Sequence, residues 1–309
     1  MARIVQPDAA GIAEAVDALR RGEVIGLPTE TVYGLAADAT NDTAVRRIFS
    51  VKGRPETHPL IVHVAEAIEL ANLTDEVTPL TRALTATFWP GPLTVIVRAN
   101  QDVSRAVTGG RDTVAVRCPA HPVAHAVIHA LGCPVAAPSA NRFGAVSPTT
   151  ATHVVVDLGN DVDIVLDGGE CEIGLESTII DCTSDSLEVL RPGAVTVEQL
   201  HTLTATLSDS SEQRVSDGTA SESRAPGMMQ SHYAPRARLV LHEPGDHFDT
   251  DGAPVLDFSG DLSTAAHTLY ARLRALDASH IALAHVIVPP PGGLGQAIRD
   301  RLTKAAAGG

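Results

Sequence analysis

The first two-thirds of the chain alternate short apolar runs with amphipathic segments. Apolar residues at helical spacing follow Asp8, a good capping residue, and end at Gly22, which predicts a helix. Short apolar runs between turn residues are typical of buried strands. On these criteria helices are expected at 8–21, 43–51, 78–88 and 123–131, and strands at 24–27, 59–64, 93–98, 113–117, 133–137, 163–166, 177–181 and 187–190.

The order of these segments predicts the fold class. A doubly wound fold places a helix after every strand, and these segments do not follow that rule. We therefore expect a twisted α/β domain whose sheet contains strands of mixed direction.

The composition changes after this region. Residues 205–223 are rich in Ser, Asp, Glu, Thr and Gly and contain little to bury, as is typical of a linker. Beyond it, strands at 238–242, 254–258 and 281–288 and helices at 264–276 and 294–304 predict a small α/β unit. The expected division is a first domain at 1–204, a linker at 205–236 and a second domain at 237–309.

Charge and composition narrow the function classes. The 309 residues carry a formal net charge of -14, which argues against tight general binding to nucleic acid. No apolar run reaches the roughly 18 residues of a membrane helix, and the N-terminus is not a signal peptide, so a cytoplasmic protein is expected. The four cysteines lack C-x-x-C spacing, so no metal site is expected.

Hydroxyl groups and cations gather in segments that follow predicted strands. Thr31 lies in PTETVYGL at a strand end, although an ordinary turn would use the same residues. Lys52 and Arg54 flank a glycine and can converge on one anion if the chain turns there; a solvated basic turn is the alternative. His58 and His63 follow closely. The spacing does not match the P-loop, so a phosphate site here is of another kind.

Three further segments add candidate binding groups. Arg117 ends a buried strand, where a guanidinium needs a carboxylate or phosphate; it is a candidate for an amino-acid carboxylate, with an internal ion pair as the alternative. Residues 137–141 (APSAN) follow a short apolar strand, and residues 147–149 are expected to begin the next helix. Their hydroxyl and amide groups and the helix N-terminus can bind phosphate or ribose oxygens. Residues 176–181 begin a strand with hydroxyl-bearing side chains, and Arg191 follows at the end of the next strand.

Together and in this order, these segments resemble the YrdC-like threonylcarbamoyl-AMP synthases. The matching stretches are PTETVYGL, KGRP with HPL, GPLTVIV, TVAVRCP, APSAN, VSPT, ESTI and RPG. Residues 225–228 and 232–235 resemble the segment that joins the catalytic domain to an extra C-terminal domain in the long form of the family. The implied fold is a twisted mixed-sheet YrdC-like catalytic domain followed by a smaller C-terminal α/β domain.

The resemblance implies condensation of L-threonine, bicarbonate and ATP to L-threonylcarbamoyl-AMP and pyrophosphate, with Mg²⁺ accompanying the ATP. A separate transferase then uses the adenylate to make N6-threonylcarbamoyladenosine (t6A) at position 37 of tRNA. Positions that match threonine contacts are Thr31, His63, Arg117, Ala137 and Ser177. Positions that match the ATP site are Lys52, Arg54, His58, Thr113, Ser139, Asn141, Ser147, Arg191 and, in the linker, Tyr233. Of these, Lys52 and Arg54 are expected to be catalytic, by stabilising charge on the phosphates.

Two departures from the family pattern and three competing functions bear on this interpretation. Met229, Gln230 and Ser231 stand where the family's linker usually carries basic and aromatic residues, and the C-terminal unit is short.

A hydrogenase-maturation carbamoyltransferase makes a related adenylate but carries zinc-finger and acylphosphatase-like segments that this chain lacks. The charge argues against an RNA-binding module, and the intact KGRP and SAN segments argue against a regulatory paralogue without the chemistry.

Overall fold

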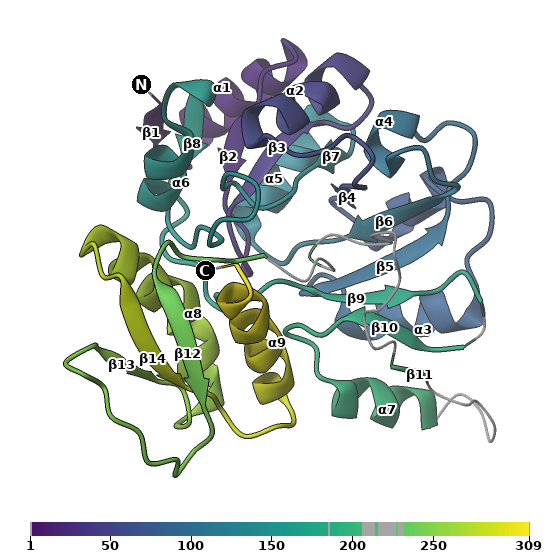
Figure 1. The fold of residues 1–309 in the computed structure, drawn as a ribbon. Coiled ribbons are helices and arrows are strands. Elements are labelled where there is room, and N and C mark those ends of the chain that lie inside the picture. Colours follow the sequence, from purple (N-terminus) through teal and green to yellow (C-terminus); the bar gives the residue numbers. More distant parts are fainter. Residues whose placement is uncertain (1, 185, 206–213, 216–226, 228–231, 309) are drawn as a thin grey trace.

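The computed structural model describes residues 2–184, 186–205, 214–215, 227 and 232–308. Within these residues the chain forms two units, a large mixed sheet packed with helices and a smaller sheet with two long helices (Figure 1). The strand order of the large sheet is β1-β8-β2-β3-β7-β4-β6-β5-β9-β10-β11. A mixed α/β architecture with a second, smaller α/β unit is confirmed. Most of the predicted linker, including Met229, Gln230 and Ser231, lies outside the described residues.

The elements of the first unit have the following bounds. Its strands are β1 Arg3–Val5, β2 Ile25–Leu27, β3 Gly34–Asp38, β4 Ile61–His63, β5 Leu93–Arg98, β6 Thr113–Arg117, β7 Val135–Ala136, β8 Ile164–Leu166, β9 Thr178–Asp181, β10 Glu188–Arg191 and β11 Arg214–Val215. Its helices are α1 Ala9–Arg20, α2 Asp42–Lys52, α3 Pro79–Phe88, α4 Arg105–Thr108, α5 Pro122–Leu131, α6 Ala151–Leu158 and α7 Val197–Ala205, with short 3₁₀ turns at Ala67–Asn72 and Gly159–Asp161.

Strand pairing brings the proposed binding residues to one edge of the large sheet. β4 and β6 are parallel and in register, so that His63 lies opposite Arg117 at their last residues. β5 is antiparallel to β6 and parallel to β9, which places the start of β9 near the end of β6. Because parallel strands end at the same edge, the loops after β4 and β6 and before β9 meet there.

The caps of α2 decide where the basic segment points. Asn41 accepts hydrogen bonds from the backbone amides of Thr43 and Ala44 and so begins the helix. Gly53 ends it with φ 65° and ψ 32°, the left-handed conformation that glycine adopts without strain. Lys52 is thus the last helical residue, whereas Arg54 lies beyond a sharp turn, and the two side chains leave the backbone in different directions.

Several elements were not foreseen from the sequence. β1 has only three residues, and α7 lies just before and within the predicted linker. β3 is a buried run of small residues, GLAAD, with no alternation of apolar and polar positions to reveal it. Among the helices of the described residues, none is long and apolar enough to cross a membrane.

The second unit contains β12 Arg238–His242, β13 Val255–Asp257, β14 Leu283–Ile287, α8 Leu262–Ala278 and α9 Leu294–Ala306. Its three strands are parallel, in the order β12-β14-β13. Its core continues into the first unit, because Val32, Val146 and Leu175 pack in the same cluster as Leu269 of α8 and Ile298 of α9. The two units are therefore joined by a shared apolar core.

We expect Gly193→Ala to lower stability. A Cβ at Gly193 would lie 2.4 Å from the Thr178 amide nitrogen and 2.5 Å from the Glu176 carbonyl oxygen, so the backbone before β9 would have to move. Overpacking of this kind costs about 1–3 kcal/mol, and thermal unfolding should show a lower midpoint. Gly260→Ala is the matched control, since no atom lies within 4 Å of its Cβ position. Equal midpoints for the two variants would contradict this prediction.

Candidate functional site

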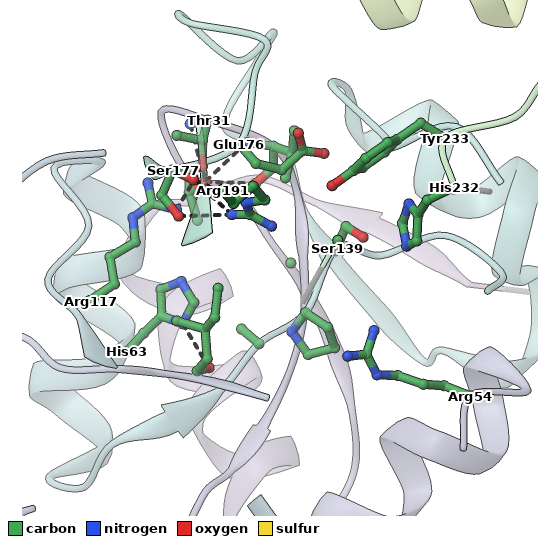
Figure 2. Close-up of a pocket in the computed structure, with 17 residues that line it drawn as sticks. Thr31, Arg54, His63, Arg117, Ser139, Glu176, Ser177, Arg191, His232 and Tyr233 are labelled. Carbon is green, nitrogen blue, oxygen red and sulfur yellow. Dashed lines mark hydrogen bonds between the residues drawn. The ribbon is translucent and has the colours of Figure 1, made fainter. Parts of the chain in front are cut away.

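A cavity lies where the loops at the ends of β4 and β6 and the start of β9 meet. Figure 2 shows that Thr31, His63, Arg117 and Ser177 gather on one side of it, while Arg54, Ser139, His232 and Tyr233 lie on the other. The cavity volume is about 50 Å³, far below the roughly 300–1,000 Å³ of sites that hold organic ligands. A ligand as large as a nucleotide therefore requires the cavity walls to move.

Arg117 lies in an internal ion pair, the alternative that the sequence left open. Its Nη2 is 2.7 Å from Glu30 Oε1, its Nη1 donates to Thr31 Oγ1 at 2.8 Å, and its Nε donates to the Gly91 carbonyl at 3.2 Å. Both charged side chains are buried, with 5% of the Arg117 side chain and 6% of the Glu30 side chain exposed. Arg117 nevertheless lines the cavity, and its guanidinium has N–H groups beyond these three with which to bind a carboxylate.

His63 is held as a neutral ring. Its Nδ1 lies 3.2 Å from the Ile61 carbonyl oxygen, which can only accept, so Nδ1 carries the proton and Nε2 is an acceptor. Burial, with the neighbouring Arg117 charge, lowers the pKa of His63 to about 3. At neutral pH this residue therefore offers the cavity a hydrogen-bond acceptor without charge.

Ser177 and Arg191 are fixed to each other at the start of β9. Arg191 donates to the Ser177 carbonyl from Nη2 at 2.8 Å and to the Ser177 hydroxyl at 3.1 Å. The same hydroxyl is 2.8 Å from Thr94 Oγ1 on β5. Ser177 thus lies at the boundary between the two sides of the cavity, in contact with a buried cation.

Glu176 lies at the centre of a buried polar network. Its Oε1 accepts from Ser147 Oγ at 2.7 Å, and its Oε2 accepts from Tyr270 Oη at 2.6 Å and Arg301 Nε at 2.8 Å. Burial alone would raise its pKa, but the charges of Arg301 and Arg191 and the hydrogen bonds hold the pKa of Glu176 at about 2. The carboxylate is ionised, and its charge is neutralised from the second unit.

Arg54 and two neighbouring groups carry buried polar atoms without a hydrogen-bond partner in the part of the chain that the structure describes. These atoms are Arg54 Nε, Asn141 Oδ1 and His232 Nδ1. Leaving such atoms unpaired costs free energy, and Arg54 and His232 line the cavity, which indicates that a ligand or water there completes them. Burial lowers the pKa of Arg54 to about 10, which leaves it charged at neutral pH.

Tyr233 closes the cavity in a strained backbone conformation. Its φ is 62°, which is uncommon for a bulky residue and persists only where the surroundings hold it. Its ring lies 5.0 Å from the Arg301 guanidinium carbon, 4.1 Å from the His232 ring and 5.8 Å from the Tyr270 ring. The residue is 1% exposed, so this end of the linker forms a closed wall.

The structure brings most of the sequence-predicted residues together. Those that line the cavity are Thr31, Arg54, His63, Arg117, Ala137, Ser139, Ser177, Arg191 and Tyr233. Those outside its lining are Lys52, His58, Thr113, Asn141 and Ser147. Asn141 and Ser147 belong to the same loop as Ser139, whereas Thr113 lies at the far end of β6 from Arg117.

The expectation that Lys52 and Arg54 converge on one anion is not met. Lys52 Nζ donates to the carbonyl oxygens of Ser139 and Asn141, at 2.5 Å and 2.6 Å, and the side chain is 3% exposed. Burial and the Arg54 charge hold the pKa of Lys52 well below its usual range. The left-handed turn at Gly53 explains the divergence, because it sends Arg54 toward the cavity and leaves Lys52 against the loop.

Sequence reasoning missed several residues of the site, among them Glu176 and His232. Glu176 precedes the predicted β9 strand, but no local pattern shows that a buried carboxylate there would meet Arg301. His232 lies beside Tyr233 in the linker, and burial lowers the pKa of its ring to about 3. Its neighbour's predicted role could have drawn attention to it.

The fold and the charges of the cavity lining together define a class of protein. Three guanidinium groups, from Arg54, Arg117 and Arg191, line one buried cavity in a chain of formal charge -14. The carboxylates nearest to them, Glu30 and Glu176, are paired with arginines. This is an α/β protein with a cavity whose cationic lining suits anionic small molecules.

Comparison with known proteins identifies the family. The Sua5/YciO/YrdC family model, described as "Telomere recombination", matches residues 17–193, and the model described as "Threonylcarbamoyl-AMP synthase, C-terminal domain" matches residues 195–307. The chain is 38% identical to the threonylcarbamoyl-AMP synthase of Bacillus subtilis over 96% of its length and 93% of the relative's. It is 37% identical to that of Pyrococcus abyssi over 93% of this chain and 92% of the relative.

A solved structure agrees with these matches. The crystal structure of P. abyssi Sua5 complexed with L-threonine superposes with a TM-score of 0.89 at 36% identity, covering 96% of this chain and 94% of that one. The chain belongs to the Sua5/YrdC family of threonylcarbamoyl-AMP synthases, in its long two-domain form.

We expect His63 to remain uncharged throughout the neutral range. Its folded pKa of about 3 lies below the unfolded value near 6.5, so the unfolded state takes up a proton first as the pH falls. Protonation of His63 in the unfolded state therefore lowers the free energy of unfolding below pH about 6.5, by up to about 1.4 kcal/mol per pH unit. This loss ends at the pH where the ring also takes up a proton in the folded state. An NMR titration should show no change of the His63 ring signals down to pH about 5. Titration near 6.5 would contradict the assignment.

Proposed function

We propose that this protein is an L-threonylcarbamoyladenylate synthase, a nucleotidyltransferase that condenses L-threonine, bicarbonate and ATP to L-threonylcarbamoyl-AMP and pyrophosphate. The adenylate would supply a separate transferase for t6A modification of tRNA. The proposal rests on the distribution of arginines around one cavity. Arg117 lies on one side of the cavity, and Arg54 and Arg191 line the other. An amino-acid carboxylate suits the first side and a triphosphate suits the second.

On the threonine side, each group has a role that its chemistry fits. Arg117 binds the carboxylate, and Thr31 Oγ1 orients that guanidinium through its 2.8 Å hydrogen bond. Neutral His63 accepts a hydrogen bond at Nε2 from the substrate's hydroxyl or amine. The Ala137 backbone and the Ser177 hydroxyl complete the wall, with Ser177 held in place by Arg191.

On the ATP side, the cavity must open before the nucleotide enters. Arg54, Ser139 and Arg191 face the space that the phosphates would occupy, and Tyr233 covers it. Asn141 and Ser147 lie on the same loop as Ser139, so a nucleotide that displaces the Tyr233 wall reaches them as well. His58 lies next to this region, with its ring 5.6 Å from that of Phe143. Thr113 is farther away, and its role as an ATP contact rests on the family resemblance alone.

Mg²⁺ would arrive with the nucleotide. In the residues that the structure describes, no group of three or more His, Cys, Asp or Glu side chains could hold a metal ion. Mg²⁺ commonly keeps several waters and binds through substrate phosphates, so the protein need not supply a full set of ligands. The two carboxylates of the site are already paired with arginines, which favours this arrangement.

The reaction requires positioning and fixed charge more than acid–base chemistry. The neutral threonine amine reacts with carbon dioxide and loses a proton to solvent, or reacts with bicarbonate and releases water. An oxygen of the resulting carbamate then attacks the α-phosphate in line while pyrophosphate leaves. Arg54 and Arg191 stabilise the charge that develops on the phosphates. Lys52, expected from the sequence to share this task, holds the loop of Ser139 and Asn141 in place. No side chain needs to become covalently attached.

The defining experiment follows pyrophosphate release and product mass with ATP, Mg²⁺, ¹³C-bicarbonate and each amino acid in turn. Threonine should support release, and the label should appear in an adenylate of the mass of threonylcarbamoyl-AMP. Release that does not depend on bicarbonate would overturn the proposal. Product formation from carbamoyl phosphate instead of bicarbonate would favour a carbamoyltransferase.

Filter binding to tRNA at two salt concentrations tests whether the protein is instead an RNA-binding module. The acidic chain should show weak binding under both conditions. Submicromolar affinity with a steep salt dependence would favour RNA binding as the function.

We expect Arg54→Ala to lower pyrophosphate release by about 10²–10³-fold, because it removes a fixed cation from the phosphate side of a buried site. Lys52→Ala should also lower it, through loss of the two hydrogen bonds to the loop at Ser139 and Asn141. Arg46→Ala is the control, since Arg46 lies on α2, the helix that ends at Lys52, with its side chain 55% exposed. Wild-type rates for both Arg54→Ala and Lys52→Ala would refute this assignment.

A further inference from the structure

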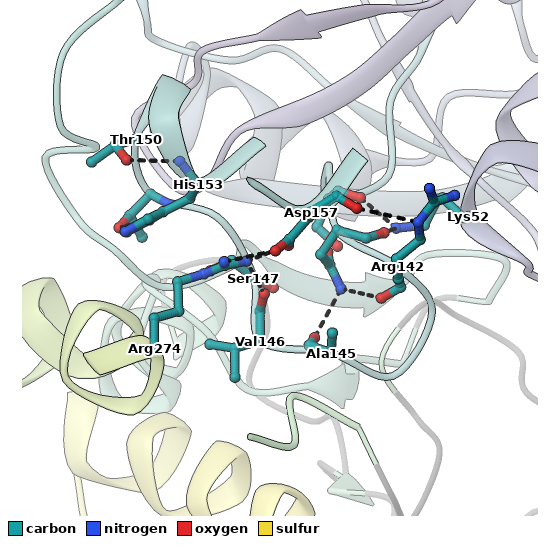
Figure 3. Close-up of polar contacts among 12 residues, drawn as sticks. Lys52, Arg142, Ala145, Val146, Ser147, Thr150, His153, Asp157 and Arg274 are labelled. Atoms are coloured by element: carbon teal, nitrogen blue, oxygen red, sulfur yellow. Dashed lines mark hydrogen bonds and ion pairs between the residues drawn. The ribbon is translucent and has the colours of Figure 1, made fainter. Parts of the chain in front are cut away.

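The loop at residues 139–149, called here the SAN loop, carries three of the proposed ATP contacts and is held on two sides. On one side Lys52 binds the carbonyls at the beginning of the loop. On the other, Arg274 of α8 donates to the carbonyl oxygens of Val146 and, at 3.1 Å, Ser147 at its end. Figure 3 shows Arg274 reaching from the second unit to this loop, with Lys52 on the opposite side.

Arg274 is itself locked in place. Its Nη1 and Nη2 form a two-pronged contact with the carboxylate of Asp157 on α6, at 2.9 Å and 2.5 Å. The two charged side chains are only 13% and 14% exposed. The planar guanidinium thus connects a helix of the first unit and two loop carbonyls at once, which a lysine ammonium at the same place could not do with the same geometry.

A second path from the C-terminal unit reaches the same loop residue. The Ser147 hydroxyl donates to Glu176, whose other oxygen accepts from Tyr270 and Arg301. Arg301 is fully buried, and its Nη2 also donates to the Pro192 carbonyl at 3.0 Å, immediately after Arg191. Ser147 is therefore fixed at its carbonyl by α8 directly and at its hydroxyl by α8 and α9 through Glu176.

The same helix α9 holds the wall over the cavity. Lys304 Nζ donates to the Gly227 carbonyl at 2.8 Å, and the Arg301 guanidinium lies against the Tyr233 ring. No comparable contact from α8 or α9 reaches Arg117, His63 or Thr31 in the described residues. The polar contacts of the second unit with the site are thus concentrated on the proposed nucleotide side.

We infer that the C-terminal unit is a working part of the nucleotide half of the active site, and that Arg274, Tyr270 and Arg301 are positioning residues for ATP use. They act by fixing the SAN loop and Ser147, not by touching substrate. This inference rests on the proposed function. It predicts that damage to these contacts weakens the use of ATP while leaving threonine binding intact.

The test compares Arg274→Gln with Arg272→Gln, a change two residues away on the same helix. The hydrogen bond of Arg272 to the Asp257 carbonyl and its cation–π contact with the Phe258 ring both lie within its own unit. For Arg274→Gln we expect the KM for ATP to rise about tenfold or more, with threonine affinity in calorimetry changed by less than about twofold. Arg272→Gln should match the wild type in both measurements.

Two milder variants keep the test decisive if Arg274→Gln folds poorly. Arg274→Lys preserves the positive charge facing Asp157 but loses the planar guanidinium that makes two parallel hydrogen bonds. Its KM for ATP should therefore rise, by a smaller factor than that of Arg274→Gln. Tyr270→Phe removes a single hydroxyl from Glu176 and keeps the ring, and should also raise the KM for ATP. Thermal melts of each variant separate loss of fold from loss of positioning.

The outcomes are distinguishable from failure of the proposed function. If wild-type protein released no pyrophosphate with threonine and bicarbonate, the proposed function itself would fall. If wild-type protein were active but Arg274→Gln, Arg274→Lys and Tyr270→Phe all kept wild-type KM values for ATP, the positioning role would be refuted. An equal loss of threonine and ATP binding would also overturn it, since that pattern indicates a general structural role.

Discussion

The buried ion pair between Glu176 and Arg301 is the interaction on which the rest of the site depends. Arg301 is fully buried, and a buried guanidinium is tolerated only with a carboxylate and further hydrogen-bond acceptors around it. Glu176 supplies the carboxylate at 2.8 Å, and in turn accepts from Ser147 and Tyr270. Removing either partner would leave an uncompensated charge beside the nucleotide side of the cavity, so the two units of the chain must fold against each other to make the site.

This arrangement also explains how an acidic chain presents a cationic cavity. The carboxylates closest to the site are each matched by an arginine, Glu30 by Arg117 and Glu176 by Arg301, so their negative charge is largely cancelled within a few ångströms. Arg54 and Arg191 then leave positive charge on the cavity wall, which suits the proposed phosphate site. Net charge describes the surface, while the pairing of individual buried groups decides what the cavity binds.

Local sequence patterns predicted much of the fold. The bounds of β5, β6 and β12 coincide with apolar runs that turn residues delimit, and α2 and α5 have the capping and C-terminal glycines that define helices. β3 escaped prediction because small residues buried on both faces give no periodic signal. The direction of Lys52 escaped prediction because it depends on the conformation of one glycine. Glu176 meets Tyr270 and Arg301 across 94 and 125 residues, a contact that no local pattern reveals.

A crystal structure of the protein with L-threonine and a non-hydrolysable ATP analogue would test the central claim most directly. The account predicts the threonine carboxylate on Arg117, the phosphates on Arg54 and Arg191, Tyr233 displaced or closed over the nucleotide, and Ser147 still bonded to Glu176 and Arg274. A nucleotide bound outside this cavity, or bound in it with the contacts of Arg274 and Arg301 to the first unit broken, would contradict the account.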